Sequence, residues 1–209
     1  MTRALALRLA KPLAHVALAL PLAWLLVQWG LIVAGETRVL GANPVEATIR
    51  FLGDWTIRIL LLTLAVSPAA RLLKQASLMA LRRPVGLWAF AYACLHLASY
   101  LGMDLLLDWQ AFWQDLDKRT YIGFGMAALV LLVPLAVTSS RAMIKRLGAR
   151  RWQRLHRLVY PAALLAVLHH GLMVKGLQAA PFIHGSLLAL LLGYRFYASR
   201  LRKNAASSA

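Results

Sequence analysis

Charged residues are scarce in this chain, and cysteine is almost absent. Only 15% of its 209 residues are Asp, Glu, Lys or Arg, whereas 61% are hydrophobic; a typical soluble domain has about a quarter of its residues charged. The single cysteine, Cys94, excludes an internal disulfide framework, a CxxC redox motif and a CxxCH motif. We interpret it as a small core residue. The few charges stand in clumps between long apolar runs, which is typical of a polytopic membrane protein.

Six apolar runs are each close to the length of about 20 residues that crosses a membrane as a helix. They cover approximately residues 13–34, 51–68, 85–103, 121–139, 155–174 and 182–197. The first run exceeds the roughly 7–15 residues of a signal-peptide core, so we predict that it is retained. Runs such as AALVLLVPLAV lack the two-residue alternation of a transmembrane strand. The predicted fold is therefore all-α, a single integral membrane domain over residues 1–209 with six transmembrane helices.

The distribution of charge predicts the orientation of these helices. The formal net charge is +17, but basic residues confined between apolar runs indicate topology rather than nucleic-acid binding. Eighteen of the 24 basic residues fall in the N-terminus, the segments after the second and fourth runs, and the C-terminal tail: Arg3, Arg8, Lys11, Arg71, Lys74, Arg82, Arg83, Arg141, Lys145, Arg146, Arg150, Arg151, Arg154, Arg157, Arg195, Arg200, Arg202 and Lys203. The seven acidic residues all fall on the other side: Glu36, Glu46, Asp54, Asp104, Asp108, Asp115 and Asp117. Both termini are then cytoplasmic under the positive-inside rule.

Two histidines inside the apolar runs are the strongest candidates for chemistry, because ionisable groups within a membrane are costly and usually functional. His96 lies in the third run and His169 in the fifth. These two runs cross in the same direction, which places the histidines within one or two helical turns of each other in depth. Imidazoles from facing helices at similar depth can ligate one haem iron from both sides. The alternative is that each imidazole only forms a hydrogen bond with a neighbouring helix.

A third histidine, His156, stands thirteen residues before His169. That spacing corresponds to a rise of roughly 20 Å and returns to within about 60° of the same helix face, which suits two stacked cofactors. The equivalent position in the third run is Arg83 rather than a histidine, so a second bis-histidine site is not supported. We therefore predict that His156 is a ligand of a less regular site, or a contact to a flavin or quinone.

The other polar, aromatic and small residues of the runs have simpler interpretations. His170 is predicted to be a packing or rim residue, and His15 and His184 to lie at the membrane interface. Asp54 and Arg58 form a mutually neutralising i,i+4 pair. Two glycines are compatible with close approach of a flat macrocycle or with helix packing: Gly86 and Gly102. Four aromatic residues are compatible with a flavin or quinone site or with an interfacial aromatic belt: Trp88, Tyr121, Trp152 and Tyr160.

Several segments resemble a known family. GLWAFAYACLHLASY around His96, WQRLHRLVY around His156 and LHHGLMVKG around His169 are similar to the haem-binding membrane subunit of the bacterial periplasmic methionine sulfoxide reductase system. This MsrQ family lies within the ferric reductase-like transmembrane group. RFLGDWTIRILLLTLAVSP and TSSRAMIKRLGARRWQRLH are also similar. The resemblance covers nearly the whole chain except its termini.

The resemblance implies an electron carrier of the bacterial inner membrane that contains b-type haem and bound FMN. Electrons would arrive from the quinone pool or a cytosolic flavin reductase. They would leave to a periplasmic, molybdopterin-containing methionine sulfoxide reductase catalytic subunit that repairs oxidised proteins, so this chain would hold no catalytic residue. Haem ligation would fall to His96 and His169, with a haem-related role for His156. Two rival functions are a self-contained ferric or cupric reductase and a non-redox transporter.

Overall fold

The computed structural model describes residues 3–36, 38–174 and 178–207, with the side chains of 3–8, 202, 203 and 205–207 left out. The described chain is helical and contains no strand, which confirms the all-α prediction. Its long helices are α1 (Arg3–Val33), α2 (Pro44–Leu72), α3 (Arg82–Ser99), α5 (Thr120–Val137), α8 (Val159–Met173) and α9 (Ala179–Ser207). Its short ones are η1 (Ala76–Leu81), the π-helical η2 (Tyr100–Asp104), α4 (Trp109–Lys118), α6 (Arg141–Leu147), α7 (Ala149–Leu155) and η3 (His156–Leu158).

Local sequence signals begin several of these helices. The Asn43 side chain accepts a hydrogen bond from the Glu46 amide at the start of α2. Pro44 is tolerated in the first turn because a backbone N–H there would have no acceptor within the helix. The Asp108 carboxylate accepts from the Ala111 amide at the start of α4. Between α6 and α7, Gly148 has a φ of +74°, a conformation that favours glycine. Each of these residues marks a boundary between consecutive elements of the fold.

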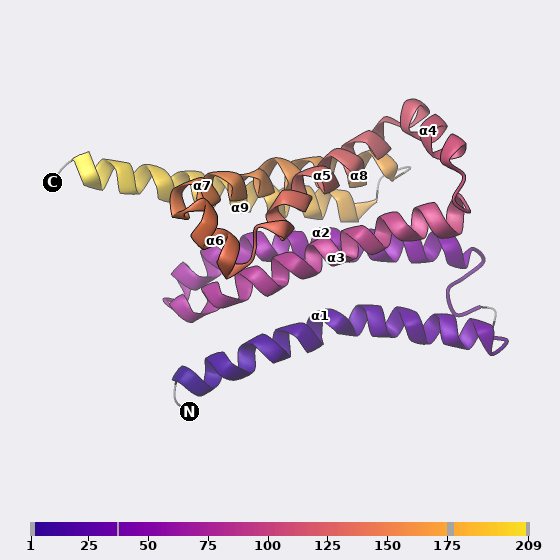
Figure 1. Cartoon of the computed structure of the whole chain (residues 1–209), viewed down its shortest axis with the longest axis horizontal. Helices are drawn as coiled ribbons and strands as arrows, with labels where there is room; N and C mark the ends of the chain where they lie inside the picture. Colours follow the sequence, from indigo (N-terminus) through magenta and orange to yellow (C-terminus); the bar gives the residue numbers. More distant parts are fainter. Residues whose placement is uncertain (1–2, 37, 175–177, 208–209) are drawn as a thin grey trace.

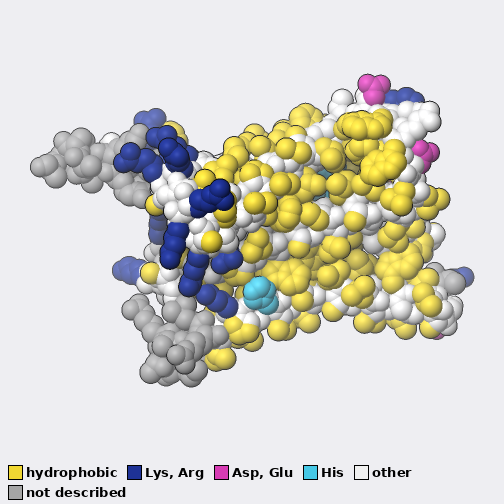
Figure 2. Space-filling model, in the orientation of Figure 1, with side chains coloured by type: hydrophobic (Ala, Val, Ile, Leu, Met, Phe, Trp, Pro, Cys, Tyr) yellow, Lys and Arg dark blue, Asp and Glu magenta, His cyan; other side chains and the backbone are white. Residues whose placement is uncertain are grey.

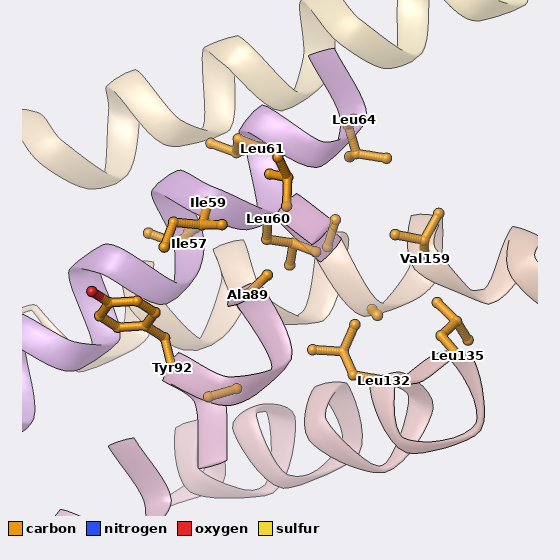
Figure 3. Close-up of a cluster of buried hydrophobic side chains, with 14 of the residues drawn as sticks. Ile57, Ile59, Leu60, Leu61, Leu64, Ala89, Tyr92, Leu132, Leu135 and Val159 are labelled. Atoms are coloured by element: carbon orange, nitrogen blue, oxygen red, sulfur yellow. The ribbon is translucent and has the colours of Figure 1, made fainter. Parts of the chain in front are cut away.

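Two helix pairs form the centre of the bundle. α2 packs along α3, and α5 packs along α8, more extensively than any other described pair. Figure 1 shows α1 beside the α2 and α3 pair, with α5, α8 and α9 on the other side of that pair. The core between them contains Leu60, Leu64, Ala89, Leu132 and Val159, all buried (Figure 3). Lipid tails are as apolar as leucine, so close packing rather than water exclusion holds such helices together in a bilayer.

A tyrosine joins α1 to this core. The Tyr92 side chain is fully buried, and its hydroxyl donates to the Leu18 carbonyl at 2.9 Å while accepting from the Leu22 amide at 3.1 Å. Leu18 and Leu22 would otherwise bond each other in the i to i+4 ladder of α1. The hydroxyl therefore inserts into the backbone of α1 beside Pro21, an arrangement that bends helices.

The surface separates into an apolar middle and two charged ends (Figure 2). Lys and Arg side chains gather at the end where α6, α7 and the chain termini lie, and the visible acidic side chains lie at the opposite end. Among the described residues, four segments are long and apolar enough to cross a membrane: Leu9–Val33, Ala76–Asp104, Thr120–Val137 and Ala179–Leu201. Of the two other predicted spans, α8 has 15 residues and α2 carries four charged residues in its first half. The side chains of Arg3, Arg8, Arg202 and Lys203 lie outside the described part.

One prediction about an individual residue is wrong. Cys94 is exposed on the bundle surface rather than buried in the core. The outward face of a membrane helix is as apolar as its inward face, so composition does not distinguish an exposed side chain from a buried one. His184, predicted to lie at the membrane interface, stands near the start of α9, and its side chain is buried at 6% exposure. His15 is exposed, and its Nδ1 accepts a hydrogen bond from the Trp88 indole at 2.9 Å.

Candidate functional site

The two central histidines meet between the helix pairs. His96 projects from α3 and His169 from α8, and their ring centres are 6.1 Å apart with the ring planes at 73°. Both side chains are half-buried. The prediction that these residues lie at matching depth and face each other is therefore confirmed.

Each imidazole is held by a backbone carbonyl of the neighbouring helix. His96 Nδ1 lies 2.9 Å from the Ile49 carbonyl oxygen on α2, and His169 Nδ1 lies 2.7 Å from the Tyr121 carbonyl oxygen on α5. A carbonyl oxygen only accepts hydrogen bonds, so in both residues Nδ1 carries the proton and donates it. Nε2 is then left with its lone pair free to bind a metal, which is the usual arrangement of a metal-ligating histidine.

A glycine lies against each ring. A Cβ atom at Gly53 on α2 would lie 3.1 Å from His96 Cε1, and one at Gly125 on α5 would lie 2.9 Å from His169 Nδ1. Favourable contacts between carbon atoms begin at about 3.5 Å. No side chain therefore fits at either position without displacement of the imidazole.

The two half-sites have the same local geometry. In each, the accepting carbonyl belongs to residue i and the glycine to residue i+4: Ile49 with Gly53, and Tyr121 with Gly125. In an α-helix residues i and i+4 lie on the same face, one turn apart. A side chain at i+4 would consequently cover the place where the incoming imidazole reaches the carbonyl of residue i. We name this carbonyl and glycine arrangement the imidazole cradle.

The space between the histidines opens into a cavity of about 420 Å³. Its lining includes His96, His169, both cradle glycines and apolar side chains of α2, α5 and α8. Cofactor sites are typically about 300–1,000 Å³ and mainly apolar. Among the described residues, no group of three or more His, Cys, Asp or Glu could hold a bare metal ion. A paired imidazole site suits an iron whose other ligands come from a porphyrin.

The ring separation fits that interpretation. A metal to imidazole nitrogen bond is about 2.0 Å long, so two imidazoles on opposite sides of one ion have ring centres roughly 6 Å apart. The observed separation is 6.1 Å. The donor nitrogens, the glycine cradles and the spacing all fit a haem held from both sides.

Comparison with known proteins agrees with this geometry. Residues 52–167, more than half of the chain, match the family model described as the ferric reductase like transmembrane component. Relatives named protein-methionine-sulfoxide reductase heme-binding subunit MsrQ occur in Rhodospirillum rubrum, 53% identical over 90% of this chain and 88% of the relative, and in Caulobacter vibrioides, 47% identical over 86% and 83%. A further one from Azospira oryzae is 48% identical over 79% of this chain and 71% of the relative.

The chain belongs to the MsrQ family. Its apolar helices and its match to a transmembrane family identify an integral membrane protein.

The third predicted site residue of this MsrQ family member, His156, lies apart from the cavity. It does not line the space around His96 and His169. Its Nε2 lies 3.1 Å from the Thr138 hydroxyl, and its ring stacks on Trp152 at 4.0 Å between ring centres. The Trp152 indole in turn donates to the Thr138 carbonyl at 2.9 Å. In this structure His156 therefore joins the start of α8 to the end of α5 through α7.

A second imidazole pair adjoins the cavity. His170 faces His184 of α9 with ring centres 5.1 Å apart, and its Nδ1 lies 3.8 Å from the Asp54 carboxylate. His170 Nε2 and His184 Nδ1 are buried and have no hydrogen-bond partner among the described atoms. The predicted Asp54 to Arg58 pair is present at 3.4 Å. The packing prediction for His170 therefore describes only part of its environment, since it also lines the cavity.

Sequence reasoning missed the two glycines that matter. It singled out Gly86 and Gly102, yet a Cβ at Gly102 would meet nothing within 4 Å and one at Gly86 would meet only Thr63. Gly53 and Gly125 carry no signal of their own in the sequence, because the cradle is recognisable only once α2 is paired with α3 and α5 with α8. Of the predicted aromatic residues, Tyr121 lines the cavity beside His169.

Proposed function

We propose that this chain is a b-type haem electron-transfer subunit in which His96 and His169 are the axial ligands. The observation that carries the proposal is the pair of opposed imidazoles, each with Nδ1 committed to a backbone carbonyl and Nε2 free. The heme-binding subunits named among its relatives support it. When bound, a haem supplies a one-electron iron couple.

The residues of the chain have three tasks in this function. The carbonyls of Ile49 and Tyr121 fix the tautomer and direction of the imidazoles and increase their basicity as ligands. Gly53 and Gly125 allow the rings to approach the backbone. The apolar lining from α2, α5 and α8 limits the access of water to the cofactor, which is one way in which proteins control reduction potential.

The proposed route runs across the bacterial inner membrane. We assign six transmembrane helices with both termini in the cytoplasm, because the basic and acidic side chains gather at opposite ends of the bundle (Figure 2). Electrons enter from the quinone pool or a cytosolic flavin reductase, and bound FMN is a further cofactor. The acceptor is a periplasmic, molybdopterin-containing methionine sulfoxide reductase catalytic subunit. The chain itself therefore carries electrons and leaves the reduction of substrate to its partner.

Optical spectra of the purified full-length protein test this function most directly. Oxidised and reduced spectra, together with quantification of haem and flavin, should show a low-spin b-type haem in stoichiometric amount. A protein expressed with sufficient haem that shows no Soret band would contradict the proposal. Steady reduction of ferric chelate without any partner protein would favour a self-contained reductase instead.

Replacement of His156 with alanine separates a cofactor role from the structural role seen here. If His156 serves only the α5, α7 and α8 junction, Thr138→Val and His156→Ala should each lower stability by roughly 1–2 kcal/mol. Each variant loses the bond between the two side chains, and it also loses the Thr138 bond to the Pro134 carbonyl or the His156 stacking on Trp152. A role at the cytoplasmic end of the electron path predicts that only His156→Ala slows haem reduction by the donor. Stopped-flow reduction and thermal unfolding of both variants measure the two effects. Normal reduction kinetics and full cofactor content in His156→Ala would exclude the cofactor role.

The acidic segment between α3 and α5 is proposed to dock the periplasmic partner. Its four acidic residues are Asp104, Asp108, Asp115 and Asp117. Two of them stabilise the local fold. Asp108 caps α4, and Asp115 accepts a hydrogen bond from the Tyr100 hydroxyl at 2.6 Å and pairs with Arg119 at 3.2 Å. Asp104 and Asp117 are exposed, but Asp104 also lines the cavity. Asp117 is therefore the better probe of docking.

We expect Asp117→Asn to slow oxidation of the reduced protein by its periplasmic reductase at low ionic strength. Complementary charge mainly raises the association rate, and salt screens it. The effect should vanish at high salt, while haem content and stability stay unchanged. Transfer rates equal to those of the unmodified protein at every ionic strength would rule out the docking role.

A further inference from the structure

The cavity has two chemically different ends. Its inner part is lined by apolar side chains such as Ile57, Leu60 and Leu132, and its outer part by Arg50 and Arg119 together with polar and acidic groups. Ten residues of α2 separate Arg50 from Leu60, which is a rise of about 15 Å. A b-type haem is a flat apolar macrocycle with two carboxylates, its propionates, on one edge. The cavity has the same distribution of polarity.

The two arginines stand next to the two cradles. Arg50 directly follows Ile49, whose carbonyl accepts from His96, and Arg119 lies two residues before Tyr121, whose carbonyl accepts from His169. One arginine thus stands one or two residues from each accepting carbonyl, on α2 in one half and just before α5 in the other.

Both arginines now pair with carboxylates of their own segments. Arg50 lies 2.7 Å from Glu46, and Arg119 lies 3.2 Å from Asp115, and both guanidinium side chains are half exposed. Exposed pairs of this i,i+4 type contribute little to stability. Arginine presents five donors, so it can keep such a partner and still bind a second carboxylate.

Acidic groups around the cavity would repel the propionates unless cations lie nearby. Glu46 and Asp104 also line the outer end of the cavity, and Asp54 lies between the two ends. Two further carboxylates placed there without a cation would experience like-charge repulsion. Arg50 and Arg119 are the only Lys or Arg residues that line the cavity in the described part of the chain.

From this placement, and resting on the haem-binding function proposed above, we infer that Arg50 and Arg119 form a propionate-binding subsite at the acidic end of the bundle. The subsite fixes the orientation of the macrocycle. Its apolar edge lies in the inner part of the cavity, and its carboxylates face the end of the bundle where the acidic side chains gather. Charge-assisted contacts between arginine and carboxylate are among the stronger hydrogen bonds in proteins.

The test is a haem titration of the full-length apoprotein in detergent, with haem b and with its dimethyl ester, which lacks the propionate charges. The variants are Arg50→Gln and Arg119→Gln. Two matched controls are Arg58→Gln, which removes an i,i+4 ion pair from the same helix α2, and Lys118→Gln, which removes the neighbouring cation of Arg119; neither residue lines the cavity.

We expect each arginine variant to bind haem b roughly tenfold more weakly and to lower its reduction potential, since removal of a nearby cation disfavours the added electron. The same variants should bind the dimethyl ester as the unmodified protein does. Both controls should match the unmodified protein with both ligands. Equal weakening for haem b and its ester would show a structural role and overturn the inference, as would unchanged affinity for haem b. Failure of the unmodified protein to bind either compound would instead reject the haem function itself.

Discussion

Replacement of either His96 or His169 with alanine should abolish the low-spin haem spectrum. In the proposed function each of these imidazoles would supply one ligand to the haem iron, since their rings face each other at the cavity. Removal of one leaves iron with a single axial protein ligand, so the spectrum should become high-spin and haem content should fall several-fold. Absorption and electron paramagnetic resonance spectra of the purified variants measure both effects.

Imidazole added to these variants separates loss of a ligand from loss of the fold. The truncated side chain leaves a space between the cradle and the iron position, and free imidazole of the same shape can occupy it. We expect partial return of the low-spin spectrum in His96→Ala and His169→Ala. His15→Ala serves as the control, because His15 is exposed and does not line the cavity. Wild-type spectra and haem content in both cavity variants would refute the assignment of the ligands.

The sequence predicts the helical class and the depth of the two central histidines well. The depth of His96 and His169 follows from counting residues along two parallel spans, and the structure brings the rings to 6.1 Å. The helical class follows equally well from six long apolar runs. Both inferences use one helix at a time, or two helices of known direction, so they need no knowledge of packing.

The sequence does not show which helices pack against each other. The imidazole cradle requires that α2 lie against α3 and α5 against α8, and the sequence does not state which helices pair. The same gap explains the error at Cys94, because a lipid-facing surface and a buried one have similar composition. It also explains Asp115, which reads as a free surface acid until Tyr100 is seen beside it. Within the site, the two histidines could be recognised in the sequence, whereas Gly53 and Gly125, which matter because they lack a side chain, could not.

We expect Gly125→Ala to lower the low-spin haem content nearly as much as loss of His96 or His169. The added Cβ would lie 2.9 Å from His169 Nδ1, so the ring must rotate away from α5 and give up its 2.7 Å bond to the Tyr121 carbonyl. This rotation would also change how the His169 ring faces His96. We expect Gly125→Ala to lose most of its low-spin haem, with the remainder shifted in reduction potential, because the hydrogen bond that tunes the ligand is also lost.

Two further glycine variants turn this into a graded test. Gly123→Ala makes the same substitution on the same helix, where a Cβ meets nothing within 4 Å, so its spectrum should equal that of the unmodified protein. Gly53→Ala places a Cβ 3.1 Å from His96 Cε1 and should give an intermediate loss. Alanine in a helix interior is favoured over glycine by roughly 0.5–1 kcal/mol, so none of the three variants should weaken its own helix. Any loss of stability in the apoproteins should be small, because the gain in helix propensity offsets much of the roughly 1 kcal/mol of a lost histidine hydrogen bond. Haem content and low-spin fraction should fall in the order Gly123→Ala, Gly53→Ala, Gly125→Ala. An equal effect at Gly123 and Gly125 would mean that the cradle does not position His169.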